Sequence, residues 1–206
     1  KFKNKIVVIH PLVRDEFYKI KKSNPNDGKF HLLVVGGSQG ASIFDKNLKK
    51  IILNISKKFS IKIIQQTHVN NIYSLKEFYN TNNIENEIFN YDKNFIEKIA
   101  KSDVCITRAG ATTLAELSIL NVPFIAVPLP NSKDNHQFEN ANFYLKNNCC
   151  WVLEQNVFDE RIEQLVTEII QNKSNYNKKK ENLNNLNCQN NWINVNQKIL
   201  DNLYEN

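Results

Sequence analysis

Residues 103–116 read Asp103-Val-Cys-Ile-Thr-Arg-Ala-Gly-Ala-Thr-Thr-Leu-Ala-Glu116, and this stretch decides the fold of the chain. Its first part, Val104–Thr107, is short, apolar and β-branched, which is typical of a buried parallel strand. Gly110 ends that run, and Thr112 and Thr113 are residue types that favour the N-cap of a helix. The residues that follow have helical spacing, so the stretch predicts a strand, a glycine turn and the start of a helix.

The predicted helix start is a candidate phosphate site. The first turn of a helix leaves backbone N–H groups unpaired and carries a partial positive charge, which together favour an anion. Glu116 lies one turn further on, where it could accept hydrogen bonds from hydroxyl groups of the same ligand. An ordinary strand-to-helix junction, in which Glu116 only complements the helix dipole, explains these residues equally well, so both interpretations stay open.

A second strand and helix follow directly. Residues 122–128 predict a buried strand that prolines open and close, and a polar loop at 129–135 leads into a helix from His136. Polar side chains at the point where a strand gives way to a helix lie at the carboxyl edge of a parallel sheet. Ligands bind at this edge in open α/β folds.

Residues 32–35 form the clearest predicted strand, which runs into Gly36-Gly-Ser-Gln-Gly40 and then a helix to about Lys57. Glycines here let the backbone approach a ligand, and Ser38 could offer its hydroxyl to a phosphate oxygen. A P-loop would need a lysine after Gly40, and none is there. A dinucleotide fingerprint would need G-x-G-x-x-G and an acidic residue after the next strand, but Gln65 and Gln66 stand there.

Two further residues are candidates for ligand contact. Asp92 follows Tyr91 at the end of a short predicted strand, and its backbone could read the edge of a base. Arg14 could form a fork with a phosphate, although a solvated surface arginine is the favoured interpretation of this residue taken alone.

The order of elements predicts the fold class. Six or seven strands alternate with helices, which indicates an α/β fold with a doubly wound parallel sheet covered on both faces and helices at the C-terminal end. Four polar turns then meet at one edge of the sheet, after residues 35, 90, 107 and 128. Their convergence predicts a nucleotide-type pocket.

Composition narrows the class of partner. The 206 residues carry a net charge of +6, yet only three are arginine, and lysine dominance fits solvated surfaces better than nucleic-acid readout. Patterns for zinc, calcium or a D-x-D metal site are absent from the sequence, so neither a metal nor a cofactor is predicted.

The four cysteines form no C-x-x-C and indicate a reducing cytosol, with Cys105 and Cys150 as core residues. No apolar run is long enough for a transmembrane helix.

Three motifs in their order and spacing resemble the MurG family. They are Leu33-Val-Val-Gly-Gly-Ser-Gln-Gly-Ala41, Arg108-Ala-Gly-Ala-Thr-Thr-Leu-Ala-Glu116 and Asp134-Asn-His-Gln-Phe-Glu-Asn-Ala141. This family comprises bacterial N-acetylglucosaminyltransferases of peptidoglycan synthesis, two-domain enzymes of the GT-B type in glycosyltransferase family 28. The resemblance covers nearly the whole chain but only the C-terminal, donor-binding half of the family.

The resemblance implies an activity and a location. The family transfers GlcNAc from UDP-GlcNAc to undecaprenyl-diphospho-muramoylpentapeptide (lipid I), giving lipid II, as a peripheral enzyme on the cytoplasmic side of the bacterial inner membrane. The chain starts with Lys1 and contains no Met, which predicts a fragment. We therefore expect residues 1–28 to lead in from a missing N-terminal domain, 29–172 to form a Rossmann-like UDP-sugar domain, and 173–206 to form a helical segment. The catalytic base and the acceptor and membrane surfaces would belong to the missing domain, so the isolated half would be inactive.

The resemblance also assigns roles to individual residues. Ser38 would contact the diphosphate, Asp92 would contact uracil through its backbone, and Glu116 would hold the ribose hydroxyls. Gln137, with His136 beside it where the family usually has a second glutamine, would face the GlcNAc hydroxyls. Arg14 would match the arginine of the Asn-Pro-Val-Arg linker motif, from which Pro11-Leu-Val-Arg14 departs. The N–H groups facing phosphate and sugar would be those of Ala111, Thr112, Thr113, Leu114 and Ala115.

Three alternatives remain. Another GT-B enzyme that uses a different UDP-sugar would differ in its sugar contacts at Gln137. A UDP-GlcNAc 2-epimerase would need its own acidic and histidine catalytic groups, and we find no such set in the sequence. A stand-alone UDP-sugar-binding subunit would be a binding module rather than an enzyme. The missing D-x-D motif agrees with the GT-B pattern, in which helix dipoles and hydrogen-bond donors stabilise the leaving diphosphate.

Overall fold

Six parallel strands form one sheet in the computed structural model, which describes residues 11, 13–23, 25–189 and 192–204, without the side chains of residues 37–41, 188, 189 and 192. The strand order is β3-β2-β1-β4-β5-β6, and each neighbouring pair is parallel. This order confirms the predicted doubly wound α/β class. The strands are β1 (Phe30–Val35), β2 (Ile61–Gln66), β3 (Glu85–Phe89), β4 (Val104–Thr107), β5 (Phe124–Ala126) and β6 (Trp151–Val152).

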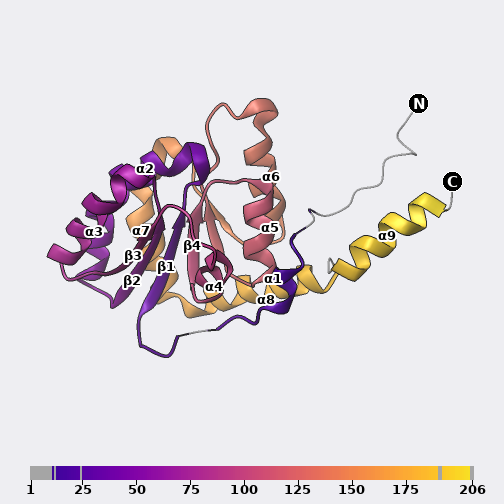
Figure 1. Cartoon of the computed structure of the whole chain (residues 1–206), viewed down its shortest axis with the longest axis horizontal. Helices are drawn as coiled ribbons and strands as arrows, with labels where there is room; N and C mark the ends of the chain where they lie inside the picture. The colour runs from indigo at the N-terminus through magenta and orange to yellow at the C-terminus, as the bar shows by residue number, and fades with distance from the viewer. Residues whose placement is uncertain (1–10, 12, 24, 190–191, 205–206) are drawn as a thin grey trace.

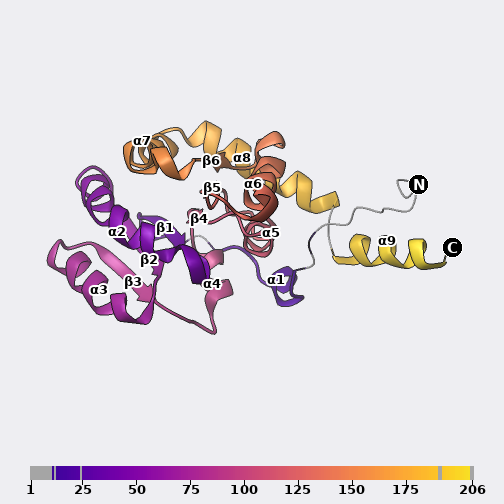
Figure 2. The ribbon, with the colours of Figure 1, turned by 90° about the horizontal axis from the view of Figure 1, so that it is seen from above.

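Helices cover both faces of the sheet (Figures 1 and 2). They are α1 (Glu16–Lys19), α2 (Gly37–Ser56), α3 (Ile72–Thr81), α4 (Phe95–Ala100), α5 (Ala111–Ile119), α6 (His136–Lys146), α7 (Phe158–Gln171), α8 (Lys173–Gln189) and α9 (Trp192–Tyr204). Three short 3-10 turns complete the described elements: η2 (Val69–Asn71), η3 (Lys133–Asn135) and η4 (Gln155–Val157).

Alternation of side chains along the strands divides the core into two layers. In β1, Leu33 and Val35 pack in a cluster with residues of α1, α4, α5 and α6. Leu32 and Val34 point to the other face and pack with α2, α3 and α7. Because both faces of a parallel sheet are buried, the strand reads as a continuous apolar run rather than an alternating one. Cys105 is fully buried within the first layer, as predicted.

Helix α5 begins earlier than the sequence predicts. Its N-cap is Gly110, with an extended backbone (φ −70°, ψ 131°) and no capping side chain. Thr112 and Thr113 lie inside the first turn, so the expectation that they cap the helix is wrong. The chain turns directly out of β4 at Gly110, and this tertiary constraint outweighs the preference of threonine for the cap position.

Two strands are shorter than predicted. The prediction at 122–128 becomes β5, Phe124–Ala126, because Pro123 and Pro128 have no N–H group to donate to a ladder. The apolar run at residues 150–153 predicts a further strand, of which Trp151–Val152 form the edge strand β6. Residues 5–9, whose apolar run predicts a strand or the extended end of a linker, lie outside the described residues.

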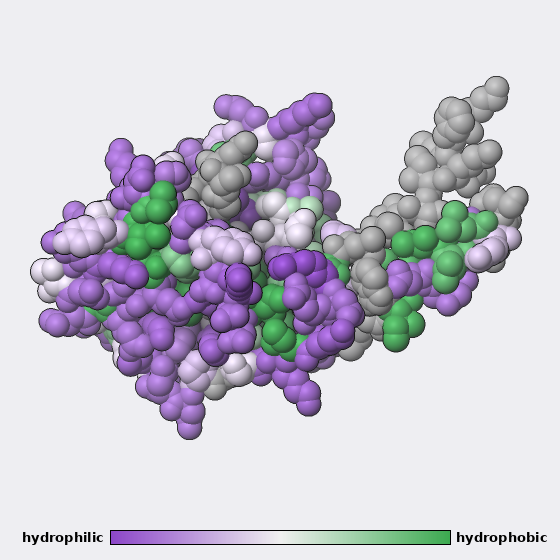
Figure 3. Space-filling view, in the orientation of Figure 1, coloured by the Kyte–Doolittle hydropathy of each residue, from purple (hydrophilic) through white to green (hydrophobic). Residues whose placement is uncertain are grey.

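The two C-terminal helices differ in their packing. Helix α8 packs against α5, where the Oγ of Ser118 donates to Oδ1 of Asn187 at 3.0 Å and Leu183 is fully buried. Helix α9 projects from the body of the domain (Figures 1 and 2). Its Ile193 and Leu203 are 75% and 67% exposed, and Figure 3 shows an apolar surface along this helix. The apolar positions of residues 192–203 predict a helix packed at the domain edge, but these two side chains do not pack that way.

None of the helices in the described part of the chain has both the length and the apolar character needed to cross a bilayer.

Candidate functional site

Strands β1 and β4 end side by side, and each leads into a helix. Val35 pairs with Thr107 at the last position of both strands. Helix α2 begins at Gly37 and α5 at Ala111, so both helix N-termini lie at the carboxyl edge where the strand order reverses. Two helix dipoles therefore present their positive ends to the same region, which is the arrangement that favours an anionic ligand.

The N-terminus of α5 is open to a ligand. The first backbone bond of the helix runs from the N–H of Leu114 to the carbonyl of Gly110 at 3.0 Å. The N–H groups of Ala111, Thr112 and Thr113 precede that bond and are free for another acceptor. A side chain at Gly110 would meet no atom within 4 Å. The space beside Gly110 is therefore open, and an anion can reach the helix end from this side.

Glu116 lies one turn into α5 and is 7% exposed. Its Oε1 is 3.6 Å from Nη2 of Arg14, whose Nη1 forms a second ion pair with Glu16 at 2.9 Å. The guanidinium also lies over the ring of Phe17, 5.1 Å from its centroid. Burial raises the pKa of Glu116, and the charge of Arg14 partly opposes that shift. The structure thus brings together two candidate residues that are far apart in sequence.

The turn that contains Asp92 is held on both sides. Asn90 donates from Nδ2 to the carbonyl of Thr67 at 2.9 Å. The carboxylate of Asp92 accepts from the N–H of Asn94 at 2.7 Å and pairs with Nζ of Lys98 at 2.9 Å. These contacts occupy the side chain of Asp92, so the backbone of this turn is the part that remains for reading a base.

The loop between β5 and α6 places Gln137 and His136. Oε1 of Gln137 accepts from the N–H of Leu129 at 2.9 Å, which fixes the side chain against its own loop. The Nδ1 atom of His136 is 2.7 Å from the carbonyl oxygen of Lys133, and this ring is exposed. The side-chain nitrogen Nε2 of Gln137 remains available, and it could donate a hydrogen bond to a hydroxyl group of the ligand.

Arg108 fastens the turn after β4 to the neighbouring loops. Its Nη1 donates to the carbonyl oxygens of Val127 at 3.2 Å and Pro128 at 3.4 Å, and its Nη2 donates to Oε1 of Gln155 at 2.7 Å. The guanidinium lies 5.4 Å from the centroid of the Phe44 ring, and burial lowers its pKa. Arg108 therefore ties β4 to the ends of β5 and β6, a function that the sequence analysis did not assign.

Asp45 is a second residue that the sequence analysis missed. This carboxylate, 7% exposed on α2, accepts from Nε2 of Gln65 at 2.8 Å, Oγ1 of Thr67 at 2.6 Å and Nδ2 of Asn71 at 2.9 Å. A carboxylate on the otherwise apolar side of a predicted helix was the available signal, since Leu48 one turn later is fully buried. The network joins the helix that starts at Gly37 to the end of β2.

Of the remaining candidates, Ser38 lies in the first turn of α2, and its side chain is outside the described part. Leu114 and Ala115 are buried within α5. Asn140 of α6 donates from Nδ2 to the carbonyl of Ala109 at 3.0 Å and holds the turn before α5.

A cavity of about 430 Å³ lies beside the β5–α6 loop, with Leu129, Phe138 and Gln155 among the residues of its wall. A group of three or more His, Cys, Asp or Glu side chains that could hold a metal ion does not occur within the described ranges.

The comparisons with known proteins agree with this architecture. A family model described as the glycosyltransferase family 28 C-terminal domain matches residues 31–191. A relative from Pelagibacter ubique (strain HTCC1062) is 46% identical over 208 residues, covering all of this chain and 58% of the relative. That relative is named UDP-N-acetylglucosamine--N-acetylmuramyl-(pentapeptide) pyrophosphoryl-undecaprenol N-acetylglucosamine transferase. The chain thus spans little more than half the length of this relative.

Solved structures share the fold. The chain resembles Acinetobacter baumannii MurG with a TM-score of 0.68 at 20% identity, covering 84% of this chain and 48% of that one. It also resembles a Neisseria meningitidis UDP-GlcNAc 2-epimerase bound to UDP-GlcNAc, with a TM-score of 0.61 at 16% identity, covering 88% and 45%. At these identities the likeness concerns the fold alone.

Proposed function

This chain belongs to the family described as the glycosyltransferase family 28 C-terminal domain, and on that premise we propose that it is the donor-binding half of a hexosyltransferase. The proposed reaction moves GlcNAc from UDP-GlcNAc to lipid I and gives lipid II in peptidoglycan synthesis. The name of the Pelagibacter ubique relative, which describes a GlcNAc transferase acting on a pyrophosphoryl-undecaprenol acceptor, supports this choice of donor and acceptor.

One observation carries the proposal. The N-termini of α2 and α5 meet at the carboxyl edge of β1 and β4, and the buried carboxylate of Glu116 lies one turn inside α5. A nucleoside diphosphate fits this combination, because its charged diphosphate suits the helix ends and its neutral ribose hydroxyls suit a carboxylate. Arg14, which pairs with Glu116, would lie close enough to the same ligand to contribute positive charge.

The remaining candidate residues take their roles from the same arrangement. Ser38 would meet the diphosphate from the first turn of α2, and the backbone of the Asp92 turn would read uracil. The free N–H groups at the start of α5 would stabilise charge that develops on the leaving diphosphate, without the need for a metal ion. Gln137 and His136, in the first turn of α6, would face the hydroxyls of GlcNAc.

The acceptor and the attacking hydroxyl require more of the protein. We propose that lipid I, the catalytic base and the contact with the cytoplasmic face of the inner membrane belong to the portion of the relatives that this chain does not span. The enzyme would then act as a peripheral protein, with transfer taking place between two domains.

Calorimetric titration tests the proposal directly. The chain should bind UDP and UDP-GlcNAc, and it should bind UDP-GlcNAc more tightly than UDP-glucose, whose sugar lacks the N-acetyl group. ADP serves as the control, since it carries the same diphosphate and ribose with a different base. Failure to bind any uridine nucleotide, or equal binding of ADP and UDP, would contradict the proposed donor site.

A further inference from the structure

Lys98 is a buried lysine on the short helix α4. It is 8% exposed, and its ammonium pairs with Oδ2 of Asp92 at 2.9 Å and with Oε1 of Glu87. The ammonium also lies over the ring of Phe89, 5.1 Å from its centroid. Burial lowers the pKa of this lysine, and the positive charges of Lys101 and Lys62 lower it further.

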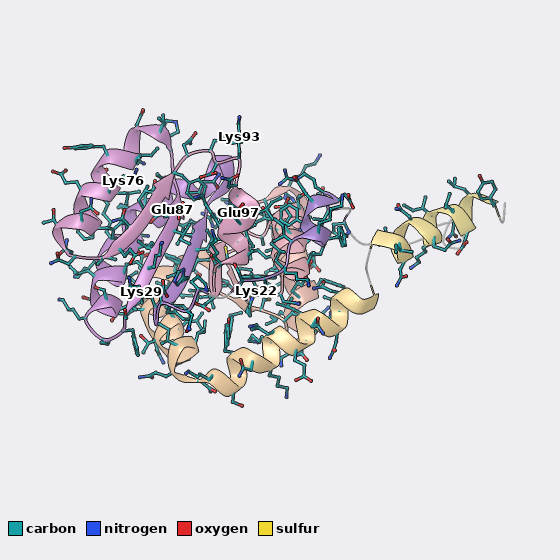
Figure 4. All side chains as sticks on the ribbon, turned by 60° about the horizontal axis from the view of Figure 1, so that its bottom comes forward. Lys22, Lys29, Lys76, Glu87, Lys93 and Glu97 are labelled. Atoms are coloured by element: carbon teal, nitrogen blue, oxygen red, sulfur yellow. The ribbon has the colours of Figure 1, made fainter. Side chains whose placement is uncertain are left out.

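The partners of Lys98 come from consecutive elements. Glu87 is in strand β3, Asp92 is in the turn that follows, and Lys98 is in the helix after the turn. Figure 4 shows Glu87 on the strand and Glu97 on the neighbouring helix α4, with Lys93 of the turn pointing away from the domain. The ammonium of Lys98 therefore connects the strand, the turn and the helix, and its ion pair with Asp92 restrains the turn.

Hydrogen bonds restrain the same turn from the opposite side. Nδ2 of Asn90 donates to the carbonyl of Thr67 at 2.9 Å, and Nε2 of Gln66 donates to the carbonyl of Asn90 at 3.2 Å. These bonds fix the start of the turn to β2. The far side of the turn, at Asp92, has Lys98 and the N–H of Asn94 as its partners. Loss of Lys98 would leave that side held by a single local bond.

We propose that Lys98 is a positioning residue that holds the Asp92 turn in the geometry that distinguishes uracil from other bases. This inference rests on the proposed function, because it assumes that the turn reads the base of a nucleotide. Uracil offers a donor at N3 and an acceptor at O4, whereas cytosine offers an acceptor at N3 and a donor at N4. A backbone with fixed N–H and C=O directions discriminates between these patterns, since the wrong base leaves polar groups unpaired. A turn free to rotate accommodates both.

The test compares Lys98→Met with the matched variant Lys101→Met. Lys101 is the C-cap residue of α4, is exposed, and pairs with Glu97 at 3.5 Å. Its positive charge repels that of Lys98 and so does not support the ion pairs of Lys98 with the turn. Each variant is titrated calorimetrically with UDP, CDP and inorganic diphosphate. Lys98→Met should bind UDP about tenfold more weakly and bind diphosphate as the parent chain does, because the helix N-termini remain in place. The ratio of UDP affinity to CDP affinity should fall in this variant and stay unchanged in Lys101→Met.

A conservative variant and a partner variant complete the experiment. Lys98→Arg keeps the positive charge and should retain most of the preference for UDP over CDP. If Lys98 only filled space, Met at this position would retain that preference equally well. Asp92→Asn keeps the backbone of the turn and removes the charge that pairs with Lys98. It should lower UDP affinity without changing diphosphate binding, and the double variant should lose little more than either single one. If Lys98→Met does not fold, the same comparison is made between Asp92→Asn, which should lower UDP affinity, and Lys98→Arg, which should retain the preference for UDP.

The outcomes separate this inference from the proposed function. Parent-like UDP binding and an unchanged UDP to CDP ratio in Lys98→Met would overturn the positioning role while leaving the donor site intact. Equal losses for UDP and diphosphate would also overturn it, because they would indicate a general structural role. Absence of UDP binding in the parent chain would instead overturn the proposed function, and this inference with it.

Discussion

At the scale of single residues, Glu116 carries the most chemistry in the candidate site. It is a nearly buried carboxylate whose nearest charged partner, Arg14, is 3.6 Å away with a side chain that is 59% exposed. A carboxylate with an incomplete set of donors, one turn inside an open helix N-terminus, is suited to accept hydrogen bonds from ribose hydroxyls. Replacement of Glu116 by Gln should weaken UDP binding about tenfold, since hydrogen bonds to a charged group are worth roughly 1.5–3 kcal/mol.

The pH dependence of binding identifies this group further. Burial raises the pKa of Glu116 above 4.5, and ribose hydroxyls bind best to its ionised form. UDP affinity should therefore fall as the pH is lowered through that raised pKa, and the Glu116→Gln variant should not show this fall. Titrations of both proteins over a series of pH values measure the difference. Parallel pH profiles would remove Glu116 from the ribose site.

Glu116 also predicts the sign of a stability effect. Because the folded-state pKa is raised above its unfolded value of 4.5, the folded protein holds this proton more tightly than the unfolded chain. The stabilisation is fully present below pH 4.5 and is lost as the pH rises through the folded-state pKa. Chemical denaturation across this window should show a smaller decrease in the free energy of unfolding for Glu116→Gln than for the parent chain.

Gln137 has two groups with separate functions. Its Oε1 accepts from the N–H of Leu129, and its Nε2 is available for a sugar hydroxyl. Gln137→Glu keeps the acceptor and removes the donor, so it should weaken UDP-GlcNAc binding severalfold and leave UDP binding unchanged. Gln137→Ala removes both groups and should in addition loosen the loop. Titration with the two ligands is the measurement, and equal losses for UDP and UDP-GlcNAc in Gln137→Glu would assign this residue to the fold.

At the scale of elements, Asp45 joins helix α2 to the end of β2 and to η2. It accepts from Gln65, Thr67 and Asn71, and Ala in its place would leave these donors unpaired in a largely buried site. We expect Asp45→Ala to lower the free energy of unfolding by about 3 kcal/mol, measured by denaturant titration. Lys46→Ala, the exposed neighbour on the same helix, is the control and should change stability little. Similar values for both variants would contradict the anchoring role of Asp45.

At the scale of the whole molecule, the chain should fold and bind UDP without transferring GlcNAc. The parallel sheet closes two apolar layers within this chain, which supports independent folding. Transfer needs a base within hydrogen-bond distance of the attacking hydroxyl and an acceptor held in line with the donor carbon. We assign both to the part of the relatives that this chain does not span. The assay combines the purified chain, radiolabelled UDP-GlcNAc and a lipid I analogue.

A second assay adds a separately produced N-terminal half from a relative. Added to this chain, it should restore measurable formation of lipid II if the two halves associate. Product above the no-enzyme level from this chain alone would show that a base lies within it. His136, exposed at the start of α6 beside the proposed sugar site, would then be the first residue to replace.

Local sequence determined the order and type of most elements. Val104–Thr107 is the strand that its β-branched residues predict, and α6 begins at His136 as its pattern predicts. Such predictions succeed because hydrophobic periodicity and turn residues act over a few positions. The same local reasoning, joined to the family motifs, placed the candidate residues other than Arg14 after the ends of β1, β3, β4 and β5. Their common position at one edge follows from parallel pairing alone.

Only the tertiary structure decided which of these residues meet. Arg14 reaches Glu116, Asp45 collects donors from β2 and η2, and Lys98 pairs with both Glu87 and Asp92. Burial and hydrogen bonding between distant segments depend on which strands are neighbours, and that order has no local signal in the sequence. The start of α5 at Ala111, with Gly110 as its N-cap, shows the same limit. The direction in which the chain leaves β4 outweighs the intrinsic preference of Thr112 for a cap, because packing of the whole layer contributes more free energy than one capping bond.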